Sequence, residues 1–260
     1  MRVTLALPTG PRHVHCYFLR GDTDDGWTLV DTGLGLMETP WDDLLAQLDG
    51  DVVRIFITHM HPDHVGGAEA AAEATGAPVF QGRLDYAQCE RVWGSDDWPE
   101  RIAEWFIRNG VPPAVSDELI ESGHVFADFV RFAWNPTLVE PGETIDGWEV
   151  LWVPGHADGH LALHRDGVLI AGDSLLAPIT PAIGLYPESR PDPLGDYIET
   201  LHALERLAPR VSYDLFGREL PPIQRRFAIA ETLSHLERLV AVGRASRHED
   251  DRGAAYTAAF

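Results

Sequence analysis

Three histidines and one aspartate stand within six consecutive positions of the chain, at His59, His61, Asp63 and His64. Imidazole nitrogens and carboxylate oxygens are donors that borderline metal ions such as Zn²⁺ accept in proteins. We expect His59 and His61 to face one ion, and Asp63 and His64 to face a second position. The alternative is an accidental histidine-rich surface loop, which the spacing disfavours because four such groups seldom fall in this order by chance.

The segment before this cluster indicates how it is positioned. Val52–Ile57 is mostly apolar and β-branched, which predicts a buried strand that ends just before the histidines. Loops at strand ends commonly hold functional sites. Pro62 stiffens the bend, and Gly66 and Gly67 let the backbone approach an ion closely. The sequence therefore predicts a metal-binding loop at the end of a core strand.

Other candidate groups also follow apolar segments. His156 comes after the expected strand 148–153, and Asp173 comes after the expected strand 168–171. Asp31 follows the expected strand Trp27–Val30, although Asp31-Thr32-Gly33 alone is equally typical of a plain turn. His160 is better interpreted as a hydrogen-bond partner of a ligand than as a ligand.

The pattern H-x-H-x-D-H at the end of a core strand resembles the signature of the metallo-β-lactamase superfamily. The Asp31 element, His156 and Asp173 match further marks of that family in order, over about residues 1–220. The resemblance implies that His156 completes the first metal site, with His59 and His61. It also implies that Asp173 bridges to the second site, with Asp63 and His64, and that Asp31 is a buried carboxylate steadying the loop.

The resemblance implies an α/β fold, the four-layer αβ/βα sandwich with two mixed sheets face to face. The residues themselves support alternating strands and helices. We expect one domain over residues 1–220 with a helical insert at about 91–136, followed by a C-terminal helix and a small hairpin over 221–260. The expected helices are 40–48, Ala68–Thr75, Arg83–Glu90, Trp98–Arg108, Val115–Ser122 and Pro193–Leu207. Thr39 is expected to be the N-cap of the first of them.

The expected insert is rich in aromatic side chains. These rings predict either the wall of an apolar substrate pocket or the insert's own core. The eight residues are Trp93, Trp98, Trp105, Phe106, Phe126, Phe129, Phe132 and Trp134. An ordered, proline-rich loop with Tyr186 is expected near the mouth of the site.

Arg218 stands where the resemblance places the last histidine of the second metal site. A guanidinium stays protonated and offers only donors, so it cannot be a ligand. Either Arg218 replaces the second ion and binds a substrate carboxylate, or it turns outward and leaves a weak second metal. We expect one tightly bound Zn²⁺, with iron or manganese as alternatives.

Composition narrows the classes of function. A chain of 260 residues with 45% hydrophobic content can bury one large core, and the net charge of −21 argues against nucleic-acid partners. The first residues are too short an apolar run for a signal peptide, and no stretch reaches the length of a membrane span. Cys16 and Cys89 form no disulfide framework. We therefore expect a cytoplasmic protein with a small-molecule substrate; the oligomeric state stays open.

These features predict a metal-dependent hydrolase that acts on an ester-like carbonyl of a thioester, ester or lactone. In this hypothesis Asp63 orients the attacking water or takes its proton. Two alternatives stay open. One is a mononuclear iron enzyme of the same fold that oxidises sulfur substrates, and the other is a non-catalytic relative marked by Arg218.

Overall fold

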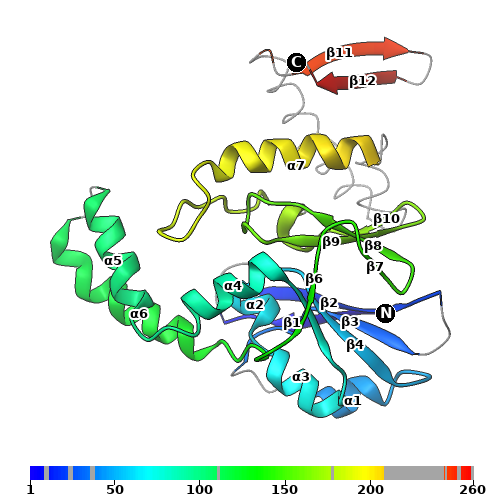
Figure 1. Cartoon of the computed structure of the whole chain (residues 1–260), viewed down its shortest axis with the longest axis horizontal. Helices are drawn as coiled ribbons and strands as arrows, with labels where there is room; N and C mark the ends of the chain where they lie inside the picture. The colour runs from blue at the N-terminus through cyan, green and yellow to red at the C-terminus, as the bar shows by residue number, and fades with distance from the viewer. Residues whose placement is uncertain are drawn as a thin grey trace.

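Two β-sheets lie face to face, and helices cover their outer sides, so that four layers are stacked (Figure 1). The computed structural model describes residues 1–8, 12–22, 26–35, 39–109, 112–176, 179–207, 243, 245–250 and 253–258. Helices α1 and α3 lie outside the first sheet, and α7 lies outside the second (Figure 1). The expected αβ/βα arrangement is confirmed.

The first sheet has six strands in sequence order. They are β1 (Arg2–Ala6), β2 (His13–Arg20), β3 (Trp27–Val30), β4 (Val52–Ile57), β5 (Val79–Gly82) and β6 (Thr137–Val139). The first three strands pair antiparallel, as expected, and β3 to β6 pair in parallel. From Leu138 onward the sequence predicts the second half of the fold. That prediction is wrong, because β6 contains Leu138 and pairs with β5 in the first sheet.

The second sheet is antiparallel. Its strands are β7 (Thr144–Ile145), β8 (Trp148–Trp152), β9 (Leu161–Arg165) and β10 (Val168–Ile170), in the order β10-β9-β8-β7. Asp166 and Gly167 join β9 to β10 with φ angles of 50° and 78°. Positive φ at both turn residues matches the right-handed twist of the paired strands, which explains why an Asp-Gly pair stands there.

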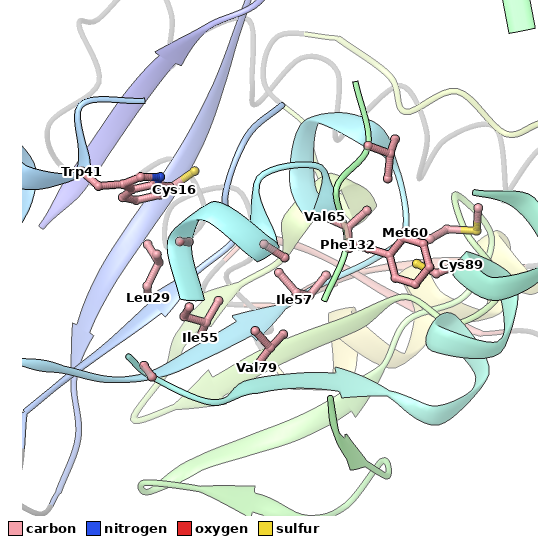
Figure 2. Packing of buried hydrophobic residues seen from close by; sticks show 14 of the residues in the cluster. Cys16, Leu29, Trp41, Ile55, Ile57, Met60, Val65, Val79, Cys89 and Phe132 are labelled. Carbon is pink, nitrogen blue, oxygen red and sulfur yellow. The ribbon is translucent and has the colours of Figure 1, made fainter. Parts of the chain in front are cut away.

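Strand β4 is buried on both faces and therefore joins two layers of core. Phe56 packs between the sheets with Val30, Val150 and Leu163. Ile55 and Ile57, whose side chains point to the opposite face, pack against the helices (Figure 2). Full burial explains the nearly continuous apolar sequence of this strand.

Among the described residues up to Leu207, the helices are α1 (Trp41–Leu45), α2 (Pro62–Val65), α3 (Ala68–Thr75), α4 (Arg83–Val92), α5 (Trp98–Arg108), α6 (Ser116–Asp128) and α7 (Pro193–Leu207), with 3₁₀ turns η1 (Pro113–Val115) and η2 (Gly172–Ser174). The expected bounds of α3, α5 and α7 are confirmed. The expected Thr39 cap is wrong: α1 begins after Pro40 with no side-chain cap, and it ends at Leu45.

Helix α6 runs six residues beyond the expected end at Ser122. Glycine is a poor helix former, but Gly123 does not end this helix. Gly123 instead lies where α6 crosses α5, and a Cβ there would stand 2.8 Å from the Cβ of Pro99. The glycine therefore permits close helix packing within the insert.

The C-terminal segment is described only at its end. Strands β11 (Ala245–Asp250) and β12 (Gly253–Ala258) pair antiparallel, which confirms the expected hairpin. The expected helix over 223–243, the expected strand over 213–216 and Arg218 lie outside the described residues. Among the helices that the structure describes, none is both long and apolar enough to cross a membrane.

Candidate metal centre

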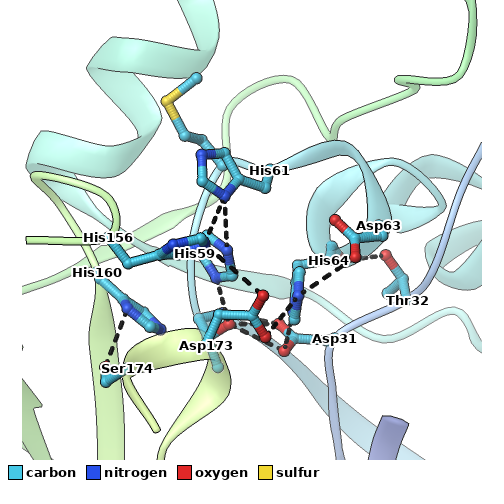
Figure 3. A network of polar contacts seen from close by, with 12 residues as sticks. Asp31, Thr32, His59, His61, Asp63, His64, His156, His160, Asp173 and Ser174 are labelled. Carbon is cyan, nitrogen blue, oxygen red and sulfur yellow. Dashed lines mark hydrogen bonds and ion pairs between the residues drawn. The ribbon is translucent and has the colours of Figure 1, made fainter. Parts of the chain in front are cut away.

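The ends of three strands bring the predicted residues to one edge of the stacked sheets. β4 leads into the histidine loop, β8 leads to His156, and β10 leads through η2 to Asp173. Two groups of potential ligand atoms form there, each with all atoms within 4.8 Å (Figure 3). One group is His59, His61 and His156, and the other is His59, His64 and Asp173.

The first group consists of imidazole nitrogens that face one another. His61 Nδ1 lies 3.1 Å from His59 Nε2 and 2.7 Å from His156 Nε2. Burial lowers the pKa of all three rings, well below the usual range for His59 and His61. His156 Nδ1 donates to the carbonyl of Ala182 at 2.8 Å, so its neutral ring keeps a lone pair on Nε2. Neutral, converging imidazoles suit a divalent metal ion.

The second group contains a buried nitrogen that faces carboxylates. His64 Nδ1 lies 2.8 Å from Asp31, and its Nε2 lies 3.2 Å from Asp173 and 3.8 Å from Asp63. Within the described residues this Nε2 is buried without a well-aligned hydrogen bond. Burial lowers the pKa of His64, but Asp173, Asp31 and Asp63 together raise it well above its usual range. Such a nitrogen needs either a proton or a bound cation between it and the carboxylates. This group of potential ligands therefore fits a metal ion.

Asp31 lies beneath the loop as the sequence predicts. It is 2% exposed, and its carboxylate accepts hydrogen bonds from the Thr58 backbone N–H at 2.8 Å and from the Thr58 hydroxyl at 2.9 Å. The same carboxylate binds His64. Asp31 adopts φ 61°, a left-handed conformation that aspartate tolerates better than most residues. The strain is compensated by these buried bonds.

Two residues hold the backbone of Met60, between His59 and His61, and the sequence predicted this role for neither. Asp85 Oδ1 accepts from the Met60 N–H at 2.9 Å, and the Trp93 indole N–H donates to the Met60 carbonyl at 2.8 Å. Asp85 occupies the first turn of α4, where acidic residues are common. The local sequence therefore cannot distinguish a buried, structural Asp85 from an ordinary acidic residue in the first turn of a helix.

The family model described as "Metallo-beta-lactamase superfamily" matches residues 9–213. The chain belongs to the metallo-β-lactamase superfamily. A second model, described as "Metallo-beta-lactamase-like, C-terminal domain", matches residues 197–258.

Relatives and solved structures agree with this assignment. The Bacillus subtilis protein named "Probable metallo-hydrolase YqjP" is 26% identical over 85% of this chain and 72% of its own length. A hydroxyacylglutathione hydrolase of Aeromonas salmonicida is 28% identical over 62% of this chain, which spans only 47% of that relative. A metallo-β-lactamase family protein from Thermus thermophilus has a similar structure, with a TM-score of 0.68, 29% identity and coverage of 99% and 98%. The chain is thus a metallo-hydrolase of this superfamily.

Three candidate residues of this metallo-hydrolase stand apart from the two groups. Asp63 lies beside His64 but belongs to neither group, and 26% of its side chain is exposed. His160 is fully buried, its ring 4.4 Å from that of His59, and its Nδ1 lies 3.0 Å from the Ser174 hydroxyl. It therefore lies next to the candidate ligands, but the expected hydrogen bond to a ligand is not found: its Nε2 is buried without a hydrogen-bond partner among the described residues. Arg218 lies in the part of the chain that the structure does not describe.

A cavity of about 390 Å³ opens beside His61 and His156. Its lining is mostly apolar and includes Met60, Val92, Trp93, Trp98, Ile102, Phe106, Leu119, Phe126 and Tyr186. Four of the eight aromatic residues of the insert thus form a wall. Phe132 instead packs in the core, and Trp134 is 59% exposed. The wall interpretation therefore holds for four of the rings, whereas Phe132 belongs to the main core of the sandwich and not to a core of the insert's own.

Proposed function

We propose that this metallo-hydrolase cleaves an ester-like carbonyl, in a thioester, ester or lactone, with the aid of a bound metal ion. One observation carries the proposal: His61 and His156 both line the apolar cavity, so a carbonyl held there meets the histidine cluster. The similarity to hydroxyacylglutathione hydrolases, although partial, supports an acyl substrate.

The residues that would hold metal fall into two sets. His59, His61 and His156 would hold the tighter ion, and Asp63, His64 and Asp173 would form a second position whose occupancy depends on Arg218. Zinc is the first choice for a histidine-rich site without thiolates. When bound, the ion lowers the pKa of a water toward about 7 and polarises the carbonyl.

The protein's own groups would perform the remaining steps. Asp63 is partly exposed beside the cluster and would orient the water and accept its proton. The apolar lining, with Trp93 and Trp98, would place the carbonyl next to His61 and exclude bulk water. Asp31, behind the cluster, would keep His64 oriented.

The test measures the rate of hydrolysis of three substrates: an acetyl thioester, an acetyl ester and a lactone. The protein is purified without added metal and assayed before and after treatment with a chelator. Chelation should abolish activity and Zn²⁺ should restore it. His61→Ala should remove tight metal binding and lower activity by orders of magnitude. His124→Ala is the matched control, because this histidine is 53% exposed on α6 and outside the candidate site.

Asp63→Asn separates the proposed proton transfer from metal binding. The variant should keep the tighter ion but lose about 10²–10⁴-fold in kcat. Full activity in the chelated protein would contradict metal-dependent hydrolysis. Tightly bound iron with oxygen consumption on a sulfur substrate would instead support the dioxygenase alternative.

A further inference from the structure

We propose that the cavity is a binding site for a neutral, apolar acyl chain, which lies between α5 and α6 with its carbonyl at His61 and His156. This inference rests on the proposed function and names its substrate class. The site is built from the helical insert, which projects from the sandwich (Figure 1).

The two insert helices turn matching faces to the cavity. On α5 the lining residues Trp98, Ile102 and Phe106 are four positions apart, which places them on one face. On α6 the lining residues Leu119, Ser122, Gly123 and Phe126 also recur at helical spacing. Helix α6 has no buried residue among those described, and Phe126 is 47% exposed. These apolar side chains therefore still have surface that a ligand can cover.

The insert is tied to the same segment that orients His156. This segment, residues 182–190, is called the strap. Arg101 of α5 forms an ion pair with Glu188 of the strap, and the Trp105 indole N–H donates to the Leu185 carbonyl at 3.2 Å. The strap also accepts the hydrogen bond from His156 Nδ1 through Ala182. The strap thus contacts both helix α5, which lines the cavity, and His156 of the histidine cluster, and so fixes the distance between them.

The lining favours a neutral chain. Among the described residues that line the cavity there is no arginine or lysine, and Glu188 is already paired with Arg101, so a carboxylate at the far end of an acyl chain would find no cation in the lining to pair with. It would also lose its hydration against the apolar wall. The volume of about 390 Å³ is near the lower end of the range for small-molecule sites, about 300–1,000 Å³, which favours chains of medium length.

The test compares N-acetylcysteamine thioesters with acetyl, butyryl, octanoyl and ω-carboxyoctanoyl groups. kcat/KM should rise about fourfold per buried methylene between acetyl and octanoyl. The ω-carboxylate should lower kcat/KM at least tenfold. Phe126→Ala and Ile102→Ala should each reduce kcat/KM for the octanoyl thioester about tenfold more than kcat/KM for the acetyl thioester. Val125→Ala is the matched control, because Val125 neighbours Phe126 on α6, is 53% exposed and does not line the cavity.

A binding measurement keeps this inference separate from the proposed function. The non-hydrolysable ketone 2-decanone should bind the metal-free protein at least tenfold more tightly than 2-butanone, and Phe126→Ala should remove most of the difference. If no thioester, ester or lactone is hydrolysed but 2-decanone binds in this way, the proposed function fails and the acyl-chain site stands. The acyl-chain site would be overturned by equal kcat/KM for acetyl and octanoyl thioesters. Equal losses of octanoyl kcat/KM in Phe126→Ala and Val125→Ala would also overturn it.

Discussion

The backbone of Met60, between His59 and His61, is held at both its N–H and its carbonyl. Asp85 binds the N–H of Met60, and Trp93, the residue that follows α4, binds its carbonyl. Holding this peptide fixes the directions in which both neighbouring histidines leave the backbone. Trp93 also lines the cavity, so its side chain contacts both the histidine loop and the cavity.

We predict that Trp93→Phe weakens the binding of Zn²⁺ and Co²⁺ about tenfold, because it removes the indole donor but keeps most of the ring. Competition with a chromophoric chelator measures the affinity, and the visible spectrum of the Co²⁺ form reports the geometry. Trp134→Phe is the control, because Trp134 is exposed and does not line the cavity. Equal affinities and identical Co²⁺ spectra in the two variants would show that Trp93 only packs.

Asp85 should give the metal-free protein an unusual pH dependence. Burial raises the pKa of Asp85 to about 8, although hydrogen bonds from Gln81 and Met60 act in the opposite direction. The unfolded chain loses this proton near pH 4. The folded state therefore binds more protons than the unfolded state between about pH 4 and 8, and stability from this group falls as pH rises through that window.

We predict that Asp85→Asn flattens this dependence, since an amide does not titrate. The slope removed is at most about 1.4 kcal/mol per pH unit. Urea unfolding of the chelated wild-type and variant proteins at several pH values between 5 and 8 measures it. Parallel stability profiles for the two proteins would show that Asp85 is ionised throughout.

At the scale of elements, α7 and the strap support the loops of the second sheet. The Tyr197 hydroxyl donates to the Ser174 carbonyl at 3.2 Å, and the Thr200 hydroxyl donates to the Pro154 carbonyl at 2.7 Å. Gly155 has φ 127°, and a Cβ there would lie 2.4 Å from the Cβ of Tyr197. Only glycine allows this turn to pack on α7, which explains the residue that precedes His156.

The ion pair between Arg101 and Glu188 should matter more than other ion pairs on the insert. Glu188 is 20% exposed, whereas the pair between Arg108 and Glu104 on the same helix is 69% and 63% exposed. We predict that Arg101→Leu raises KM for an octanoyl thioester about fivefold, equivalent to about 1 kcal/mol. Arg108→Leu should leave KM unchanged. Similar effects of both substitutions would mean that the strap is positioned without this contact.

At the scale of the whole molecule, the candidate site lies across the two sheets. The histidine loop follows β4 of the first sheet, while His156 and Asp173 follow strands of the second. An ion shared between these ligands would couple the sheets, because its binding energy is lost when they separate.

Zinc should therefore raise the unfolding temperature. At a free concentration 100 times the Kd, the gain is about 2.7 kcal/mol, or about 5–10 °C for a chain of this size. Differential scanning calorimetry with Zn²⁺ and with Mg²⁺ measures the shift. His61→Ala should show little response to Zn²⁺; an equal shift in that variant would place the stabilising ion elsewhere.

Much of the fold could be predicted because its signals are local. The H-x-H-x-D-H spacing, the buried run Val52–Ile57 and the Asp-Gly turn each occupy a few neighbouring residues, and helices α3, α5 and α7 match their expected bounds. These features depend on the spacing of apolar residues and on the backbone conformations that each residue prefers. Both can be determined from the sequence alone. They also carry the likeness to the superfamily, which the family model confirms.

Contacts between distant segments were decided by the tertiary structure alone. Nothing near Asp85 or Trp93 indicates that they bind Met60, 25 and 33 residues earlier. Likewise, the aromatic pattern could not say that Phe126 lines the cavity while Phe132 enters the core, since both depend on how α6 crosses α5. A local period shows which side chains share a face, but only the packing of elements shows what that face meets.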